Sequence, residues 1–339
     1  MMNKKTKERI TYIDFCKLIA IFLVCFGHSI QYTSKNYFMH DEIWELIYSF
    51  HMPLFMIISG CFCLSSFKLT FGDFLKKKSI QLLIPPTFCY LIIDVPYSIY
   101  FRGFHSVLTL NYLKCIIEDF WFLKSLFACY LIAYIHLKIL NNIYMAAMFS
   151  ILLVCLLPQF NFVYINFMLP FFWTGAILHK NINCFNENLF TIFAVSSFSF
   201  LGLLINWNGN FTIYHSPIII DFGKENYQLI IIALYRFFIG FNGSLLVITV
   251  VKLLFDNYGN NYLLYLSNIG KSTMCIYIIQ SYILERTLIK LNFKFIMPYL
   301  YFESFFITIG VIVISLVLIY FIKRNKILSF FLLGGKSVI

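Results

Sequence analysis

The sequence predicts an all-α integral membrane protein, a polytopic bundle of about ten transmembrane helices with both termini cytoplasmic. Hydrophobic residues make up 60% of the 339 residues and charged residues only 12%, whereas a soluble domain has about 45–50% and about 25%. The apolar residues form continuous runs long enough to cross a bilayer as helices. They do not show the ten-residue alternation of β-barrel strands. No internal repeat or soluble domain is visible, so we expect residues 1–339 to form one membrane domain.

We expect each helix where an apolar run approaches the about 20 residues that a bilayer crossing needs. In order, the ranges are 10–30, 43–64, 79–100, 119–139, 142–158, 161–178, 189–206, 227–251, 264–289 and 297–322. The fifth and sixth runs are short and the eighth is long, so their ends are the least defined. The first run follows a basic segment but carries Asp14, Lys17 and His28 and lacks a small-residue cleavage site, which argues against a cleavable signal peptide.

The basic residues predict the orientation of these helices. If the N-terminus is cytoplasmic, 15 Lys and Arg residues fall in inside segments and 6 in outside loops, and an excess of basic residues marks the cytoplasmic side. The formal charge of +11 is therefore a topology signal, and we expect a lipid bilayer and no nucleic acid as partner. These features predict a multi-pass protein of the cell (cytoplasmic or inner) membrane.

A lysine cluster, Lys76, Lys77 and Lys78, ends the segment F-K-L-T-F-G-D-F-L-K-K-K at 67–78. The segment can lie in the cytoplasmic interface with its aromatic rings in the lipid. Two interpretations stay open: an anchor that fixes the topology, or a site for an anionic group such as a nucleotide phosphate.

The first helix carries polar residues that are costly in hydrocarbon and therefore need an explanation. Asp14 and Lys17 are three residues apart and can pair on one helix face. Lys17 and His28 are eleven residues apart, which returns to within about 20° of the same face and separates them by roughly 16 Å. One stripe thus carries a charged pair near the cytoplasm and an imidazole near the outer surface. The alternative is a structural ion pair and an interfacial histidine.

The second helix contains His51 and, two residues later, Pro53, which frees a backbone carbonyl and can kink the helix. His28 and His51 could therefore lie at similar depth in the outer half of the membrane. Histidine titrates near neutrality and can accept a proton during catalysis. A structural hydrogen bond is the alternative role for each.

Other signals are weaker. Trp121 and Lys124 are expected near the outer mouth, and Arg236 could bind an anion or pair with another helix. Glu285 and Arg286 are expected in solvent near an outer helix end. The ten cysteines are expected to act as small apolar side chains, with no metal site. Serine-elbow, Walker and H-E-x-x-H motifs are missing from the sequence, which favours direct transfer by a general base over an acyl-serine or ATP-driven mechanism.

Together, these segments resemble acyltransferase family 3, whose multi-spanning members O-acylate saccharides. The resemblance covers most of the chain. It is carried by Asp14 to His28, F-H-M-P-L-F-M-I-I-S-G at 50–60, W-F-L-K-S-L at 121–126, F-F-W-T-G-A-I-L at 171–178, N-I-G-K-S-T-M-C-I-Y-I-I-Q at 268–280 and L-L-G-G-K at 332–336. Two positions depart from the family pattern: Lys17 replaces a usual Arg and so lacks its bidentate fork, and Gln280 replaces a frequent His.

The resemblance implies acetyl-CoA or another acyl-CoA as cytoplasmic co-substrate, no metal, and a saccharide or lipid-linked glycan as acceptor from outside. It implies His28 and His51 as catalytic residues, with direct transfer or a transient acyl-histidine both open. We assign donor binding to Asp14, Lys17, Lys76, Lys77, Lys78 and Arg236, and acceptor binding to Trp121 and Lys124. Two other classes remain: a transporter or exporter of glycans or lipid-linked sugars, since intramembrane charges serve transporters equally well, and a non-catalytic partner of a glycan synthase.

Overall fold

The computed structural model describes residues 11–35, 38–104, 107, 119–156, 164–213, 227–259, 261–291, 293–296 and 298–335. Within these ranges the chain is helical, with one isolated bridge between Ser34 and Phe295. The termini and the basic residues at 4–9 lie outside the described residues, so the predicted topology of the chain ends stays a prediction.

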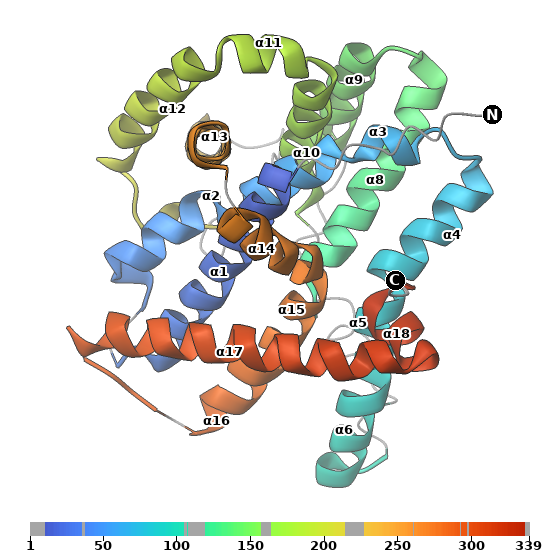
Figure 1. Ribbon diagram of the computed structural model, residues 1–339, viewed down its shortest axis with the longest axis vertical. Coiled ribbons are helices and arrows are strands. Elements are labelled where there is room, and N and C mark those ends of the chain that lie inside the picture. The colour runs from blue at the N-terminus through green and yellow to red at the C-terminus, as the bar shows by residue number, and fades with distance from the viewer. Residues whose placement is uncertain are drawn as a thin grey trace.

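The helices are arranged around α1 and α2, which cross at the centre of the molecule (Figure 1). The longer helices are α1 (Thr11–Thr33), α2 (Glu42–Cys61), α4 (Phe71–Leu82), α8 (Trp121–Leu140), α9 (Ile143–Leu156), α10 (Ile165–Lys180), α12 (Leu189–Leu204), α13 (Tyr227–Tyr258) and α17 (Tyr299–Arg324). The shorter ones are α3 (Cys63–Ser66), α5 (Ile84–Cys89), α6 (Val95–Arg102), α11 (Ile182–Glu187), α14 (Asn261–Ile269), α15 (Thr273–Gln280), α16 (Ile289–Leu291) and α18 (Lys326–Leu333).

Every predicted helix corresponds to helical structure, but the number of membrane crossings is not confirmed. Among the described residues, α1, α2, α8, α17 and the part of α13 from Ile230 are long and apolar enough to span a membrane. A sixth span results if the pair Phe71–Leu82 and Ile84–Arg102, bent by 43°, counts as one. The apolar helices α9 and α12 are shorter. The predicted positions 10, 157–158, 161–163 and 297 lie outside the described residues.

Two helices that the sequence predicts as continuous are interrupted. The run 79–100 bends after α4, before Pro85 and Pro86, because proline lacks the amide hydrogen that continues a helix. The run 264–289 changes from α14 to a 3₁₀ turn at Gly270–Ser272, then to α15, and then to a π-helix at Ser281–Leu288. π-Helical turns are rare and often occur at functional sites.

Glycines let the central helices touch backbone to backbone. A Cβ atom on Gly60 would lie 1.9 Å from the carbonyl oxygen of Phe172, and one on Gly175 would lie 1.9 Å from that of Ile57. These positions therefore accept only glycine without a shift of α2 or α10, in keeping with the small residues found where membrane helices pack closely. Gly270 makes an equally close contact with the Asp14 carbonyl oxygen, at 1.8 Å from an added Cβ.

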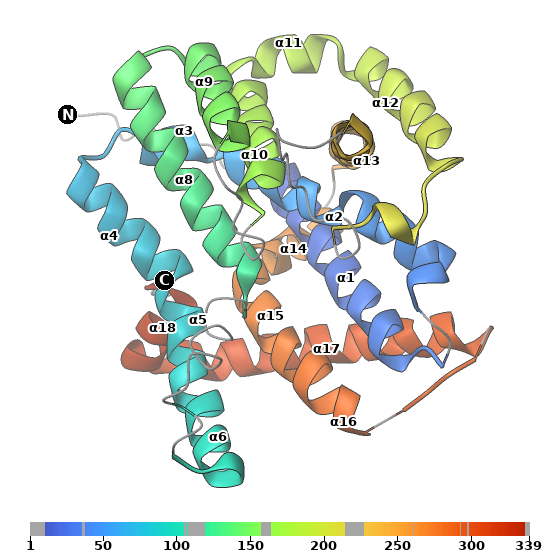
Figure 2. The ribbon, with the colours of Figure 1, turned by 180° about the vertical axis from the view of Figure 1, so that it is seen from behind.

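The long helix α17 runs along one side of the bundle and packs against α1 (Figure 2). Two hydroxyl pairs join these helices: Ser29 with Thr308, and Thr33 with Ser304, each at 3.3 Å. Interhelical hydrogen bonds of this kind help to hold membrane helices together. The first helix of the chain is thereby held between its sequence neighbour α2 and an element near the C-terminus.

Candidate active site

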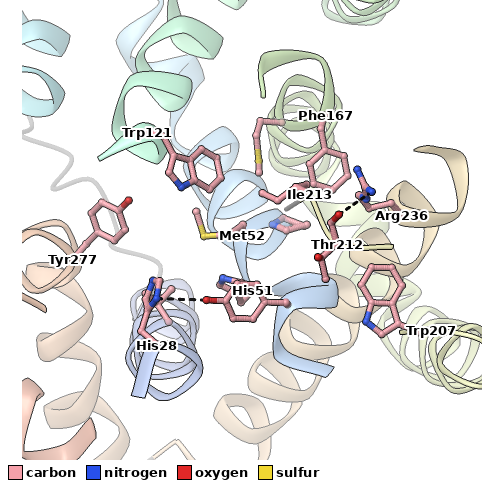
Figure 3. A pocket seen from close by; sticks show the side chains of 14 residues that line it. His28, His51, Met52, Trp121, Phe167, Trp207, Thr212, Ile213, Arg236 and Tyr277 are labelled. Carbon is pink, nitrogen blue, oxygen red and sulfur yellow. Dashed lines mark hydrogen bonds between the residues drawn. The ribbon is translucent and has the colours of Figure 1, made fainter. Parts of the chain in front are cut away.

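A small buried pocket lies where α1, α2, α8, α10, α13 and α15 converge, and we call it the histidine pocket (Figure 3). Its volume is about 30 Å³. Its lining includes His28, His51, Met52, Trp121, Arg236 and Tyr277. The pocket therefore brings together the two histidines that the sequence singled out, and Trp121 also lines it.

His28 sits among aromatic and polar side chains at the far end of the α1 stripe. Its Nδ1 lies 3.5 Å from the Tyr48 hydroxyl, and its ring stacks on Tyr32 with the ring centres 5.8 Å apart. Its Nε2 lies 3.7 Å from a carboxylate oxygen of Glu285. A carboxylate beside an imidazole stabilises the imidazolium that forms when the histidine accepts a proton. The surroundings of His28 therefore suit a general base.

His51 is buried and its ring orientation is fixed by the backbone of its own helix. Its Nδ1 lies 2.7 Å from the Ile47 carbonyl oxygen, which can only accept a hydrogen bond. This contact assigns the proton to Nδ1 and leaves the Nε2 lone pair available. The Tyr48 ring lies 4.6 Å from the His51 ring. Tyr48 thus contacts both imidazoles and connects them across the pocket.

Arg236 lies in the histidine pocket, which differs from our grouping of this residue with the donor-binding lysines. Its side chain is 2% exposed. It donates from Nε to the Phe211 carbonyl at 2.6 Å and from a terminal nitrogen to the Thr212 carbonyl at 3.2 Å. Arginine carries five donors in a fixed fork and readily holds such backbone oxygens. Arg236 therefore fixes the loop that presents Thr212 to the pocket (Figure 3).

A second and larger cavity, which we call the lysine cavity, has a volume of about 270 Å³. Its lining includes three lysines, Lys17, Lys78 and Lys271, together with Gln81, Tyr130 and Ser59. Three cationic side chains on one cavity favour an anionic ligand. Lys271 and Gln81 were not singled out in the sequence, although Lys271 lies in the G-K-S turn that contacts Asp14 through Gly270.

Lys17 and Lys78 are held in place by specific partners. Lys17 pairs with Asp14 at 2.9 Å, as the three-residue spacing predicts, and its amino group lies 4.4 Å above the Phe62 ring. The Lys78 amino group lies 3.5 Å from the centre of the Tyr130 ring, a distance typical of a cation–π contact. Asp14, which we assigned to donor binding, is almost fully buried and lines neither cavity.

The other members of the lysine cluster point elsewhere. Lys76 and Lys77 are exposed on α4 and do not line the lysine cavity, whereas Lys78 is buried. Successive residues on a helix are about 100° apart, so three consecutive lysines cannot share one face. Lys124, assigned to the acceptor with Trp121, lines neither cavity and instead donates to the Asp119 backbone carbonyl.

An ion-pair network beside the pocket was missed in the sequence analysis. Arg286 bonds to the carboxylates of Asp94 and, at 2.8 Å, Asp119, and Tyr282 donates to Asp94 at 2.8 Å. Our expectation that Arg286 is solvated is therefore wrong, because its guanidinium is paired with these carboxylates. The pairing was not visible in the sequence, since the partners lie 167 and 192 residues away in the chain. Burial raises the pKa of Asp119, while the Arg286 guanidinium acts in the opposite direction.

Gln280, where the family pattern often has His, lies outside both cavities. Its side chain is fully buried, and its two amide atoms make no hydrogen bond within the described residues. It is four residues from Leu284 and precedes the π-helix that carries Glu285. Nothing in this placement gives Gln280 a contact with the histidines.

The histidine pocket and the lysine cavity meet. Both are lined by Met52 of α2 and by Tyr277 of α15. On α1, Lys17 lines one and His28 the other, and eleven helical residues rise by roughly 16 Å. The cationic cavity and the histidine pocket are therefore adjacent, with Met52 and Tyr277 at the junction between them.

Comparison with known proteins identifies a family and similar proteins for this chain. The sequence matches the family described as "Acyltransferase domain" over residues 10–324. It is 28% identical over 179 residues to a Nodulation protein NolL of Sinorhizobium fredii, covering 50% of this chain and 48% of that protein. It is 24% identical over 294 residues to a Nodulation protein NolL of Mesorhizobium japonicum, covering 81% and 76%. The chain thus aligns with about half the length of the first relative. No solved structure is significantly similar to it.

Proposed function

Because this chain belongs to the acyltransferase domain family, we propose that it moves an acyl group from an acyl-CoA to a hydroxyl of a saccharide. Family membership and the apolar helices make it a membrane-embedded O-acyltransferase. The donor, the acceptor and the side from which each enters are our proposal. We propose acetyl-CoA from the cytoplasm and a cell-surface or lipid-linked glycan from outside.

The observation that supports this most directly is the junction of the two cavities at Met52 and Tyr277. The lysine cavity offers cations to the phosphates of CoA, and the histidine pocket offers bases to a hydroxyl group. A thioester that extends from the first cavity toward the second would bring its carbonyl to the histidines. The two substrates would then meet inside the bundle without crossing the membrane.

At the donor end, Lys17, Lys78 and Lys271 would bind the anionic part of CoA. Ion pairs with phosphate oxygens are among the stronger hydrogen bonds in proteins. The cation–π contact with Tyr130 already holds the Lys78 amino group at the cavity wall. Lys76 and Lys77 are not part of this proposal, since their side chains are exposed away from the cavity.

At the reacting end, His28 would act as general base and Glu285 would stabilise its protonated form. The acceptor hydroxyl loses its proton to His28 while its oxygen bonds to the thioester carbonyl carbon. The carbon–sulfur bond then breaks, and His28 returns the proton to the leaving sulfur. His51, with its proton fixed on Nδ1 by Ile47, would accept a hydrogen bond from the acceptor and orient it.

Mass spectrometry of surface glycans tests the reaction. We expect a strain that lacks this protein to lose acyl groups on glycan chains of normal length and amount, and His28→Ala to fail to restore them. Loss of the exported chains themselves would instead indicate a transporter. Unchanged acylation in the deletion strain would contradict the proposal.

Cysteine labelling tests the sides of the two cavities. We expect Lys77→Cys to react with a membrane-impermeant maleimide only after the cells are opened. The background variant carries Cys184→Ser, which removes the thiol exposed among the described residues, and Cys115→Ser, because Cys115 lies outside them. Strong labelling in intact cells would place the lysine cavity on the outer side and contradict the proposed entry of CoA from the cytoplasm.

A further inference from the structure

The junction between the two cavities is formed by side chains of different stiffness. Tyr277 projects from α15, and its ring packs edge-on against the rings of Phe120 and Phe122, with centres 6.3 and 5.9 Å apart. Met52 projects from α2, directly after His51, and is 8% exposed. An aromatic ring packed between others forms a fixed wall, whereas a methionine side chain is flexible and fills irregular space.

The space beyond this junction is small. The histidine pocket has a volume of about 30 Å³, about one ninth of that of the lysine cavity. It is therefore the tighter of the two spaces and limits the size of the acyl group that can enter. The lysine cavity, at about 270 Å³, sets no comparable limit on the donor.

From this geometry we propose that Met52 and Tyr277 set the acyl-chain length, admitting acetyl to the histidine pocket and excluding longer acyl groups. The inference rests on the proposed function. An acyl group that reaches His28 from the lysine cavity must pass these two side chains, because both line both spaces. Each additional methylene must then displace Met52 or press on the Tyr277 wall.

The magnitude of the expected selectivity follows from packing. One methylene in a fitted apolar pocket changes the specificity of an enzyme by about 10–200-fold. Overfilling a packed site also forces neighbouring side chains away from their preferred positions. We therefore expect kcat/KM for acetyl-CoA to exceed that for propionyl-CoA by about 10-fold or more, with butyryl-CoA lower again.

The experiment measures release of free CoA from acetyl-, propionyl- and butyryl-CoA by native membranes that contain the protein and its glycans. Membranes with His28→Ala give the background. We expect Met52→Ala to bring the kcat/KM values of the three thioesters within a few fold of one another. Met52→Leu keeps the volume and should keep the preference for acetyl.

Met274→Ala is the matched control, because Met274 is a methionine that lines the lysine cavity but not the histidine pocket. It should keep the preference for acetyl over propionyl. Tyr277→Leu opens the junction from the other side and should relax selectivity even if Met52→Ala does not accumulate in the membrane.

The outcomes separate the two proposals. Absence of His28-dependent CoA release from all three thioesters would contradict the proposed function. His28-dependent release at equal kcat/KM from acetyl- and butyryl-CoA by the wild-type protein would contradict the junction proposal alone. So would unchanged selectivity in both Met52→Ala and Tyr277→Leu, or an equal loss of selectivity in Met274→Ala.

Discussion

The lysine cavity and the histidine pocket differ in size, charge and how firmly their polar groups are held. The lysine cavity is about nine times larger, at about 270 Å³ against about 30 Å³, and its cations rest on ring faces and on Asp14. In the histidine pocket, His51 and Arg236 are each fixed by backbone carbonyls. A roomy cationic cavity suits binding of a large anion, whereas a small rigid pocket suits chemistry that depends on position.

This difference separates binding from catalysis in space. Changes in the lysine cavity should weaken binding of the donor and leave the rate of the chemical step intact. Changes in the histidine pocket should slow the chemical step and leave donor binding intact. Kinetic constants can distinguish these effects, since loss of uniform binding raises KM and loss of a transition-state contact lowers kcat.

Replacement of His28 should have the largest effect. We expect His28→Ala to lower kcat by about 10²–10⁴-fold, the usual contribution of a general base, with the Kd of acetyl-CoA nearly unchanged. His28→Gln keeps a hydrogen-bonding side chain but cannot accept the proton, so it should be nearly as inactive. The assay is acylation of native glycans together with acetyl-CoA binding. Wild-type activity in His28→Gln would show that His28 is not the general base and would leave His51 as the next candidate.

Glu285→Gln should have a smaller effect on the same constant. Glu285 is partly exposed and its carboxylate lies 3.7 Å from the imidazole, so we expect kcat to fall by about tenfold, equivalent to about 1.4 kcal/mol of lost transition-state stabilisation. An unchanged kcat in Glu285→Gln would remove this carboxylate from the mechanism.

Lys17 tests the lysine cavity. We expect Lys17→Ala to raise the Kd of acetyl-CoA by about tenfold, the value of one charge-assisted hydrogen bond, with kcat changed much less. Lys17→Arg keeps the charge beside Asp14 and should lose less, although the geometry of the fork differs from that of an amine. Binding is measured on protein that remains monodisperse in detergent. Full activity in both variants would remove Lys17 from the mechanism.

The adjacent lysines of α4 give the smallest but sharpest comparison. Lys78 is buried at the cavity and Lys77 is exposed. Lys78→Ala should raise the Kd of acetyl-CoA by about three- to tenfold, more at low salt than at high salt, because salt screens the attraction. Lys77→Ala should leave the Kd unchanged. Equal effects of the two replacements would mean that the cluster acts as a diffuse surface charge.

The sequence predicted the helices well where local signals mark their ends. Asp41 caps α2 by accepting from the Trp44 amide at 2.9 Å, and the predicted start at 43 is one residue from the observed one. The pairing of Asp14 with Lys17 also followed from spacing alone. The bend before Pro85 was missed, although proline gave a local signal for it, because the apolar run continues across the break.

The site was less accessible to sequence reasoning because its contacts join distant segments. Glu285 approaches His28 across 257 positions of the chain, from a π-helix that a regular helical pattern does not reveal. Arg236 was grouped with the lysines by charge, but its position on α13 places it over the loop at Phe211 and Thr212. Charge alone did not distinguish a ligand-binding cation from one that holds backbone carbonyls.

The contact of α1 with α17 has a consequence for biosynthesis. Ser29 and Thr308 are 279 residues apart, so at about 5–20 residues per second the ribosome needs roughly 15 to 60 seconds to supply the partner helix. During that time the polar side chains of α1 face lipid or the insertion machinery without their partners on α17. It can do so because Ser29 and Thr33 already donate to the carbonyls of Cys25 and Ser29 within the helix, and Lys17 already neutralises Asp14. The helix that carries the candidate base is thus provided with local partners before its final ones are made.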